Sequence, residues 1–414
     1  MTQHWRVALA ALSAAFIAQA CGQQQTGDQR DISGADREYQ QVLLEALLDA
    51  QPGSVIEIPA GVFVFDRGLS LSNVDGVTIR GAGMDETILS FQEQRAGAEG
   101  LLVTGSNNFT IEDLAIEDTI GDALKITGGE NIIIRRVRTE WTRGVSTDNG
   151  AYGIYPVLTR NVLIEESVAI GASDAGIYVG QSDNIVVRNN RAEYNVAGIE
   201  IENSMDADVY GNVATNNTGG ILIFNMPNLP RPGQGTRVFD NDVYDNNTRN
   251  FGHAGTPVAS VPAGTGILVN SNDDVEIFEN RVARHRTANV IISSLHSAGY
   301  SDLGVEADFD PYPERIYVHS NTFEGGGNNP DPLELQALRI AMFGPTGRIP
   351  DVLWDGYYDA DKLVDGEMPE SLRICVSGAE VLNADGPNGY ASPRIATADH
   401  ACSHDPRPAV ELPF

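Results

Sequence analysis

Four side chains that could bind or process a sugar stand at matching places in successive copies of one short phrase. Lys125, Tyr155, Tyr178 and Glu200 each lie two places after the Gly or Ala of their own copy. Aromatic rings pack against the apolar faces of pyranose rings, and charged groups bind hydroxyls or carboxylates. This column predicts a sugar-binding surface. The alternative is an ordinary mixed surface in which tyrosine serves as a strand former.

Two long insertions could complete such a site. They span residues 226–234 and 246–264, and loops rooted on a rigid scaffold commonly form its binding face. If they fold over the column, they bring acid–base and cationic groups to it. The candidate catalytic residues are Glu200, Tyr178 and His253, and the candidate substrate-binding residues are Lys125, Tyr155 and Arg231. The set suits proton abstraction next to a uronate carboxylate.

A short sequence repeat must position these side chains. The phrases Ala175-Gly-Ile, Ala197-Gly-Ile and Gly219-Gly-Ile are evenly spaced, and Thr265-Gly-Ile follows after roughly twice that interval. Apolar residues alternate with period two, which indicates short strands. Short strands in a unit this small predict a single-stranded parallel β-helix of about nine coils, each adding about 4.8 Å.

Stacking of the coils predicts columns of like side chains. The columns start from nine anchor residues: Gly76, Asn108, Asn131, Asn161, Asn184, Asp206, Gly235, Asp274 and Arg315. The residues one and three places after each anchor are almost all apolar and are expected to form the core. Six places after the anchor, five coils carry Asn, which predicts an asparagine ladder at a turn.

A further column, four places after each anchor, is expected to face solvent. It reads Arg80, Glu112, Arg135, Glu165, Arg188, Tyr210, Phe239, Phe278 and His319. The first five members alternate in sign, so we expect a surface ladder of ion pairs that fixes the register.

The chain divides into four parts. Residues 1–20 are expected to be a signal peptide, 21–33 a polar tether, 34–325 the β-helix with an N-terminal cap, and 326–414 an irregular C-terminal cap. An amphipathic helix is expected from Glu38 to Ala50, and a short helix around Leu333 to Met342.

The N-terminus predicts export. Arg6 precedes an apolar stretch that is too short to span a bilayer and ends at Ala18-Gln19-Ala20-Cys21. This end fits an ordinary cleavage site. It also resembles a bacterial lipobox, in which Cys21 becomes lipidated, and Gly22 then suggests the periplasmic face of the outer membrane. Without lipidation the protein would be soluble in the periplasm or secreted.

Cysteine content and charge narrow the possible partners. With Cys21 set apart, Cys375 and Cys402 remain, and an oxidising compartment favours a disulfide between them over free thiols. The net charge of −30 argues against nucleic acid as a partner. No cofactor or metal site is assigned, although the turn from Asn270 to Asp274 is a possible Ca²⁺ ligand set; a plain polar turn is the alternative.

The repeat run as a whole resembles a known family. The stretches 161–180, 189–203 and 214–224 resemble exported bacterial parallel β-helix repeat proteins, often lipoproteins, which are functionally uncharacterised. The resemblance implies a right-handed β-helix and, through neighbouring genes in that family, a possible dihaem cytochrome c partner. The fold is also remotely similar to that of pectate lyases and mannuronan C5-epimerases. Their Asp-Pro-His-Asp signature is not present here, so fold similarity does not transfer the activity.

Three functions follow as hypotheses. The first is an exported protein that binds or organises a polysaccharide at the cell envelope. The second is a polysaccharide lyase or C5-epimerase that acts on uronates. The third is an accessory protein of an envelope redox system.

Overall fold

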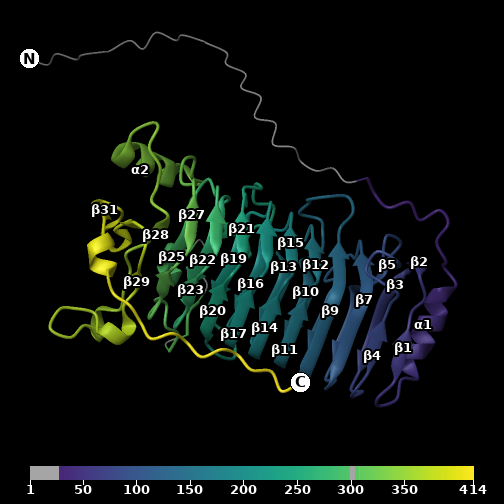
Figure 1. Cartoon of the computed structure of the whole chain (residues 1–414). Helices are drawn as coiled ribbons and strands as arrows, with labels where there is room; N and C mark the ends of the chain where they lie inside the picture. Colours follow the sequence, from purple (N-terminus) through teal and green to yellow (C-terminus); the bar gives the residue numbers. More distant parts are fainter. Residues whose placement is uncertain (1–27, 299–303, 307) are drawn as a thin grey trace, which may run out of the picture.

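The computed structural model describes residues 28–298, 304–306 and 308–414, and its fold is a right-handed parallel β-helix (Figure 1). In each coil the chain passes through three faces. Face 1 contains β1 (Val55–Glu57), β4 (Thr78–Arg80), β7 (Phe109–Glu117), β9 (Glu130–Glu140), β11 (Arg160–Glu165), β14 (Asp183–Arg188), β17 (Met205–Tyr210), β20 (Gln234–Phe239), β23 (Glu276–Phe278), β26 (Tyr317–His319) and β29 (Cys375–Val376). Face 2 contains β2 (Gly61–Val64), β5 (Thr87–Ser90), β12 (Val168–Ile170), β15 (Arg191–Glu193), β18 (Val213–Thr215), β21 (Asp242–Tyr244), β24 (Arg281–Ala283), β27 (Thr322–Glu324) and the second halves of β7 and β9. Face 3 contains β3 (Arg67–Ser72), β6 (Ala96–Thr104), β8 (Leu124–Thr127), β10 (Tyr152–Val157), β13 (Ala175–Gly180), β16 (Ala197–Glu202), β19 (Gly219–Phe224), β22 (Thr265–Asn270), β25 (Ala288–Ser293), β28 (Val352–Trp354), β30 (Val381–Asn383) and β31 (Arg394–Ile395).

The remaining elements are short helices. The α-helices are α1 (Tyr39–Leu48) and α2 (Leu333–Phe343), and the 3₁₀ turns are η1 (Pro257–Ser260), η2 (Leu295–Ser297), η3 (Ala360–Lys362), η4 (Glu370–Leu372), η5 (Gly386–Asn388) and η6 (Thr397–His400). Both expected α-helices are present, within a few residues of their predicted ends. Among the described strands every pairing is parallel except that of β30 with β31.

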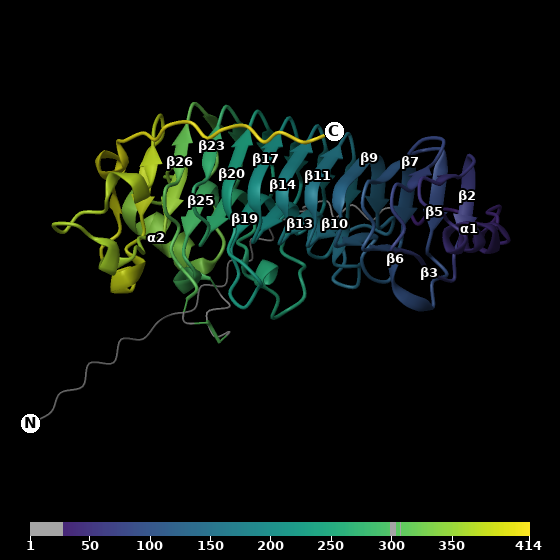
Figure 2. The ribbon, with the colours of Figure 1, turned by 90° about the horizontal axis from the view of Figure 1, so that it is seen from below.

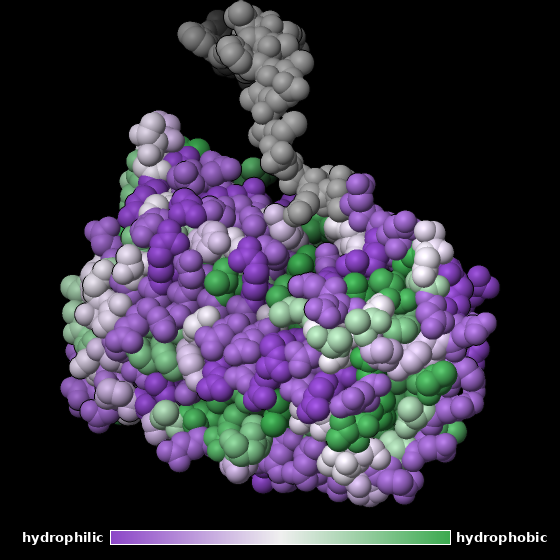
Figure 3. All heavy atoms as spheres, turned by 45° about the vertical axis from the view of Figure 1, so that its right-hand side comes forward, coloured by the Kyte–Doolittle hydropathy of each residue, from purple (hydrophilic) through white to green (hydrophobic). Residues whose placement is uncertain are grey.

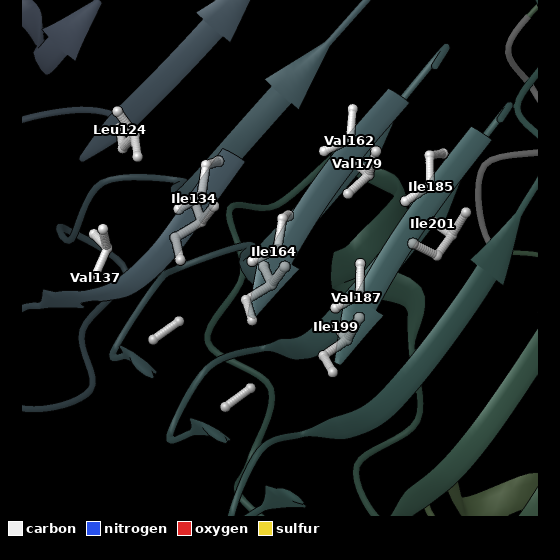
Figure 4. Close-up of a cluster of buried hydrophobic side chains, with 14 of the residues drawn as sticks. Leu124, Ile134, Val137, Val162, Ile164, Val179, Ile185, Val187, Ile199 and Ile201 are labelled. Atoms are coloured by element: carbon white, nitrogen blue, oxygen red, sulfur yellow. The ribbon is translucent and has the colours of Figure 1, made fainter. Parts of the chain in front are cut away.

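The core lies inside the coils, where equivalent residues stack. Ile164 is the register partner of Ile134 on one side and of Val187 on the other, and all three are fully buried (Figure 4). β-branched side chains suit this position because they pack well on a pleated surface. The predicted stacking of consecutive coils is confirmed.

Backbone conformation explains which residue types occupy the anchor positions. All nine anchors have a left-handed backbone, with φ from 53° at Asn108 to 85° at Gly235. Asn, Asp and Gly tolerate this conformation best, and Arg315 is the one anchor outside that group. Neighbouring anchors also bond side chain to side chain: Asn131 Nδ2 donates to Asn108 Oδ1 over 2.8 Å.

Asparagine ladders run along two corners. The predicted one is present in Asn190, Asn212, Asn241, Asn280 and Asn321. The amide of each of the first four donates to the next asparagine, and every one of the five donates to a backbone carbonyl. The second was not predicted. It joins Asn195, Asn217 and Asn246, and then His285, whose Nε2 accepts from Asn246 Nδ2 over 3.1 Å. Burial lowers the pKa of His285 to about 4, so its ring is neutral.

The ion-pair column on face 1 is also confirmed. Glu165 lies between Arg135 and Arg188, bonding the latter at 2.6 Å. Beyond Arg188 the column becomes a stack of rings, Tyr210, Phe239, Phe278 and His319, with centroids 4.8, 4.9 and 5.3 Å apart. Its first members are less exposed than expected: Glu112 and Glu165 are buried.

The chain ends of the solenoid are closed differently. α1 covers the first coils with Leu43 and Leu47, and the surface around that end is mostly hydrophilic with separate apolar patches (Figure 3). At the C-terminal end the β-helix extends beyond residue 325, its predicted limit. β28, β29 and β30 continue faces 3 and 1 in parallel register within the segment expected to be irregular.

The final residues run back along face 1 as a strap (Figure 1). Arg407 Nη2 pairs with Asp206 at 3.0 Å, the Val410 amide donates to Asp208, and Asn184 Nδ2 donates to the Glu411 carbonyl. The strap therefore covers several coils whose own strands are far away in sequence.

A disulfide fastens the start of this strap. Cys375 and Cys402 are bonded with an S–S distance of 2.04 Å and close a loop of 27 residues. We expect the Cys375→Ser, Cys402→Ser double variant to lose about 3 kcal/mol of unfolding free energy, because the unfolded chain gains loop entropy. Thermal unfolding checks this, with the wild type under reducing agent as control. Equal stability of the variant would contradict it.

The last residues of the expected tether, from Arg30 on, are bound to the β-helix rather than free. Residues 1–27, which include the predicted signal peptide and Cys21, lie outside the described residues. Arg30 Nη2 donates to Glu117 Oε1 over 2.8 Å and the Arg30 carbonyl accepts from Gln92. The boundary predicted at residue 33 is therefore too late. Within the described parts, no helix has the length and apolar character that crossing a membrane requires.

Candidate functional site on face 3

The column that suggested chemistry is assembled by the register of face 3. Tyr155 is the partner of Lys125, and Glu200 is the partner of Tyr178 on one side and Leu222 on the other. The column was expected to face solvent, and this is wrong for its centre. Tyr178 and Glu200 are each only 3% exposed, and Leu222 is fully buried.

The cover is the insertion at residues 246–264 (Figure 2). Val258 and Val261 pack in one apolar cluster with Tyr178 and Leu222. Asn250 holds the insertion in shape, since its Nδ2 donates to the carbonyls of both valines over 2.9 Å. This insertion therefore folds over the column as hypothesised. The other, residues 226–234, instead packs Met226 and Leu229 against Leu295.

A second loop meets the cover from the N-terminal side. Thr147 Oγ1 donates to the Phe251 carbonyl over 2.8 Å, so residues 143–149 and the insertion form a continuous wall beside β10 and β13. Phe251 packs against the same apolar cluster as Tyr152 and Tyr155.

Three carboxyl groups gather beneath this wall. Glu200 and Glu202 point to the same side because successive strand residues alternate, and Asp174 precedes β13. Tyr178 Oη donates to Glu202 Oε1 over 2.7 Å and accepts from Gln181 Nε2 at 3.3 Å. Glu200 Oε2 is buried and has no hydrogen-bond partner among the described residues.

Glycine makes room for this arrangement. Gly180 follows Tyr178 on the same face, and a Cβ built on Gly180 would lie 2.3 Å from Tyr178 Oη. The tyrosine ring therefore lies across Gly180, which directs its hydroxyl to Glu202. Any side chain at Gly180 would displace it.

Burial separates the acidities of the three carboxyl groups. Desolvation and the charge of Glu202 raise the pKa of Asp174 to about 8. Desolvation also raises the pKa of Glu202 to about 6, against the opposing Tyr178 hydrogen bond. Desolvation, with Asp174 and Glu202 nearby, holds the pKa of Glu200 well above its ordinary value. At pH 7, Glu202 is therefore mainly ionised and Asp174 mainly protonated.

Three tyrosines form the aromatic side of the site. The rings of Tyr152, Tyr155 and Tyr178 lie 4.5 to 4.9 Å apart. Tyr152 fits because its register partner on the next coil is the small Ala175. Tyr152 and Tyr155 are half-buried and therefore reach the surface. Burial raises the pKa of Tyr155 to about 12, so the phenol stays protonated.

The candidate residues divide between this site and elsewhere. Lys125, Tyr155, Tyr178 and Glu200 come together: Lys125 Nζ lies 4.7 Å from the Tyr155 ring centroid and 3.5 Å from Asp122.

The remaining two candidates lie elsewhere. His253 is exposed on the insertion. Arg231 lies at the corner after β16, where its guanidinium pairs with Asp183 at 2.8 Å and its carbonyl accepts from Asn203. The structure thus gives Arg231 a structural partner.

Sequence reasoning missed Glu202, Asp174 and Tyr152. Glu202 was detectable, since it lies two residues after Glu200 on the same strand and so shares its face. Asp174 and Tyr152 carried no periodic signal, because neither matches the residue type at its place in the neighbouring coils.

Further along face 3, the outer surface is apolar. Between the insertion, α2 and residues 384–393 lies a cavity of about 880 Å³, lined mainly by Leu268, Ile291, Leu335, Met342 and Leu353. Such a lining offers few partners for sugar hydroxyls, so any polysaccharide chemistry belongs to the tyrosine and carboxyl end of the face.

The turn from Asn270 to Asp274, suggested as a Ca²⁺ site, belongs to a carboxyl cluster that already has a cationic partner. Asp273 groups with Asp310 and Glu314, and Lys362 Nζ bonds Asp310 at 2.6 Å and Glu314 at 2.8 Å. The lysine already supplies the compensating positive charge, and Ca²⁺ binding stays an untested expectation.

Comparisons with known proteins agree with this fold. Residues 61–230 match the family model described as right handed beta helix region. The A-module of mannuronan C-5 epimerase AlgE4 from Azotobacter vinelandii is 20% identical, covers 78% of this chain and 89% of its own, and has a TM-score of 0.50. The A-module of AlgE6 from the same organism is also 20% identical, with coverage of 71% and 85% and a TM-score of 0.47. At 20% identity the AlgE4 likeness concerns the fold alone, and that fold is a right-handed parallel β-helix.

A curated relative is the preneck appendage protein of Bacillus phage PZA, which is 21% identical over 61% of this chain. The match covers 38% of that relative, so the chain spans less than two-fifths of its length.

Proposed function

We propose that this protein binds a neutral polysaccharide on the outer surface of face 3, at the Tyr152–Tyr155 pair. The observation that carries the proposal is the meeting of half-buried aromatic rings with hydrogen-bonding carboxyl groups at one point of the solenoid. Sugar rings stack on aromatic faces while their hydroxyls bond to carboxyl groups. The epimerase with the similar fold is named for mannuronan, and a polysaccharide ligand for this chain is in keeping with that.

Charge favours a neutral glycan over a polyuronate. The chain carries a net charge of −30, which repels polyanions. The two cations that were candidates for a uronate carboxylate, Lys125 and Arg231, already face Asp122 and Asp183.

A glycan array with neutral and acidic polysaccharides tests this proposal. We expect binding to neutral glycans and a loss of about tenfold in affinity for Tyr155→Ala, or about 1.4 kcal/mol. Tyr390→Ala, at an exposed tyrosine away from the site, is the control and should bind as the wild type does. A blank array, or binding that Tyr155→Ala leaves unchanged, would overturn the proposal.

A second candidate function is acid–base catalysis on the bound glycan. The favouring observation is that the ionised Glu202 lies beside the protonated Asp174, and acid and base roles are divided in this way in enzymes that act on sugars. Glu202 would act as the base and Asp174 as the acid, in place of His253.

Assays for new reducing ends, 4,5-unsaturated uronates and epimerised residues separate hydrolysis, elimination and epimerisation. We expect Glu202→Gln to lower any such turnover at least 100-fold while glycan binding persists. Unchanged turnover in this variant would exclude Glu202 as the base.

Export and lipidation belong to the same proposal. We expect Cys21→Ser to move the protein from the membrane fraction to the soluble fraction, because the lipid is the proposed anchor. The mass of the mature N-terminus checks this. The outer-membrane location and the dihaem cytochrome c partner rest on the family resemblance and remain open to co-purification tests.

A further inference from the structure

The outward-facing column of face 3 changes character along the solenoid. It is polar and aromatic as far as Glu200 and apolar in the coils that follow. The apolar members are register partners in five neighbouring strands: Leu222, Leu268, Ile291, Leu353 and Leu382. Adjacent apolar side chains on the outer face of a sheet indicate that something other than water lies against them.

Helix α2 lies over the middle of this apolar column but does not close the space above it. The floor of the cavity of about 880 Å³ includes Leu268, Ile291 and Leu353, and its wall includes Leu335, Leu338 and Met342 of α2. The three α2 side chains recur at helical spacing and are only half-buried. An apolar stripe of α2 therefore faces an apolar column of face 3, with a cavity, here called the α2 cavity, between them.

Hydrogen bonds at both ends of α2 hold the helix in this position. Just before the helix, the Asp331 amide donates to Thr287 Oγ1 over 3.0 Å, and its carboxylate accepts from the Ala263 amide over 3.2 Å. After the helix, the Ile349 amide donates to the Gly327 carbonyl over 2.8 Å. Because these bonds lie outside the apolar stripe, α2 would have to break them to settle further onto the sheet. The α2 cavity is thus preformed, which lowers the cost of binding.

The lining of the α2 cavity selects against charged ligands. None of the described residues that line it is Lys, Arg or His, so an anion finds no positive partner there. Its two carboxyl groups belong to Asp355, which is buried and accepts from the hydroxyls of Ser294 and Ser297, and to the exposed Glu334. A charged group placed against the apolar walls would lose its hydration without compensation. An uncharged hydrocarbon loses nothing of this kind.

We propose that the α2 cavity binds a neutral lipid, with the hydrocarbon chain between the face 3 column and the α2 stripe. Such binding removes the apolar surfaces of ligand, column and stripe from water together. The volume of the cavity falls in the range of about 300–1,000 Å³ that is typical of small-molecule sites. The site does not rest on the polysaccharide proposal: β10 and β25 are five strand spacings apart, or about 24 Å.

Fluorescence titration of the full chain with the uncharged dye N-phenyl-1-naphthylamine tests this inference. We expect saturable binding of the dye, and displacement by 1-dodecanol at a concentration at least about tenfold lower than by dodecanoate, which has the same chain length and a negative charge. Leu335→Asp should lower the affinity for the dye about tenfold, because it places a charge in the apolar wall. Met342→Trp should also lower it, by filling the cavity while keeping the wall apolar.

Leu333→Asp is the matched control: it makes the same change on the same helix, at a leucine that is 83% exposed and outside the lining. It should bind the dye as the wild type does, and so should Tyr155→Ala, which keeps this test independent of the one on polysaccharide binding. The inference would be overturned by the absence of saturable dye binding, or by unchanged affinity in both Leu335→Asp and Met342→Trp. Self-association that Leu335→Asp abolishes, without dye binding, would instead show that a second copy of the chain covers the column.

Discussion

Asn212→Ala is expected to lower the free energy of unfolding by about 3 kcal/mol or more. Asn212 is 1% exposed, and its Oδ1 accepts from both the amide and the Nδ2 of Asn190, while its own Nδ2 donates to the Val187 carbonyl and to Asn241 Oδ1. Alanine leaves these buried donors and acceptors unpaired within two neighbouring coils.

Chemical unfolding and hydrogen exchange measure this loss. Asn328→Ala, at an exposed asparagine outside the ladder, is the control and should change stability by less than about 0.5 kcal/mol. Asn321→Ala, at the half-buried end of the ladder, should give an intermediate loss because water can reach the groups it releases. A loss below about 1 kcal/mol for Asn212→Ala would show that the ladder is not a main source of stability.

Asp174→Asn is expected to stabilise the protein at pH 8 and to have little effect at pH 4. The folded protein holds the Asp174 proton until about pH 8, whereas the unfolded chain releases it near pH 4. Between these values the folded state binds more protons, so the stability of the wild type falls as pH rises from about 4 to about 8. The neutral amide has no proton to lose and removes this dependence.

The size of the stabilisation expected for Asp174→Asn follows from the shift in the pKa of Asp174. A pKa raised from 3.8 to about 8 corresponds to about 6 kcal/mol, and because the Asp174 side chain is only half-buried we expect on the order of 3 kcal/mol of this to be measured. Thermal unfolding across pH 4–8 checks it, with the exposed Asp148→Asn as control. Because the net charge of −30 also destabilises the fold at high pH, the difference between variant and control is the informative quantity. Equal stability of wild type and Asp174→Asn at pH 8 would mean that Asp174 is ionised in the folded protein.

The two substitutions are expected to change the free energy of unfolding in opposite directions: Asn212→Ala lowers it, whereas Asp174→Asn raises it at pH 8. A buried polar residue with all its hydrogen bonds made stabilises the solenoid, as Asn212 does. The carboxyl cluster opposes folding at neutral pH, and proteins keep such groups where they serve a function.

Local periodicity made the solenoid predictable. Stacked coils repeat the same environment at a nearly constant interval along the chain, so the core column, the left-handed anchors and the asparagine ladder each leave a mark at that spacing. The coils of β28 and β30 escaped prediction because long loops separate them and they lack the Gly-Ile phrase.

The candidate site was only half predictable, for a physical reason. Tyr155, Tyr178 and Glu200 lie on the repeat, and the register brings them together. His253 and Arg231 lie on insertions, whose final positions depend on tertiary contacts such as those of Val258 and Asp183. The same contacts bury the centre of a column that the strand pattern alone would leave in water.

Hydrogen exchange measured by mass spectrometry, with and without the strongest ligand from the glycan array, tests most directly whether face 3 binds polysaccharide. We predict slower exchange in peptides covering residues 143–157 and 247–263, with no change in the face 1 strands β11, β14 and β17. Protection confined to face 1, with none beside Tyr155, would contradict binding at the tyrosine and carboxyl cluster.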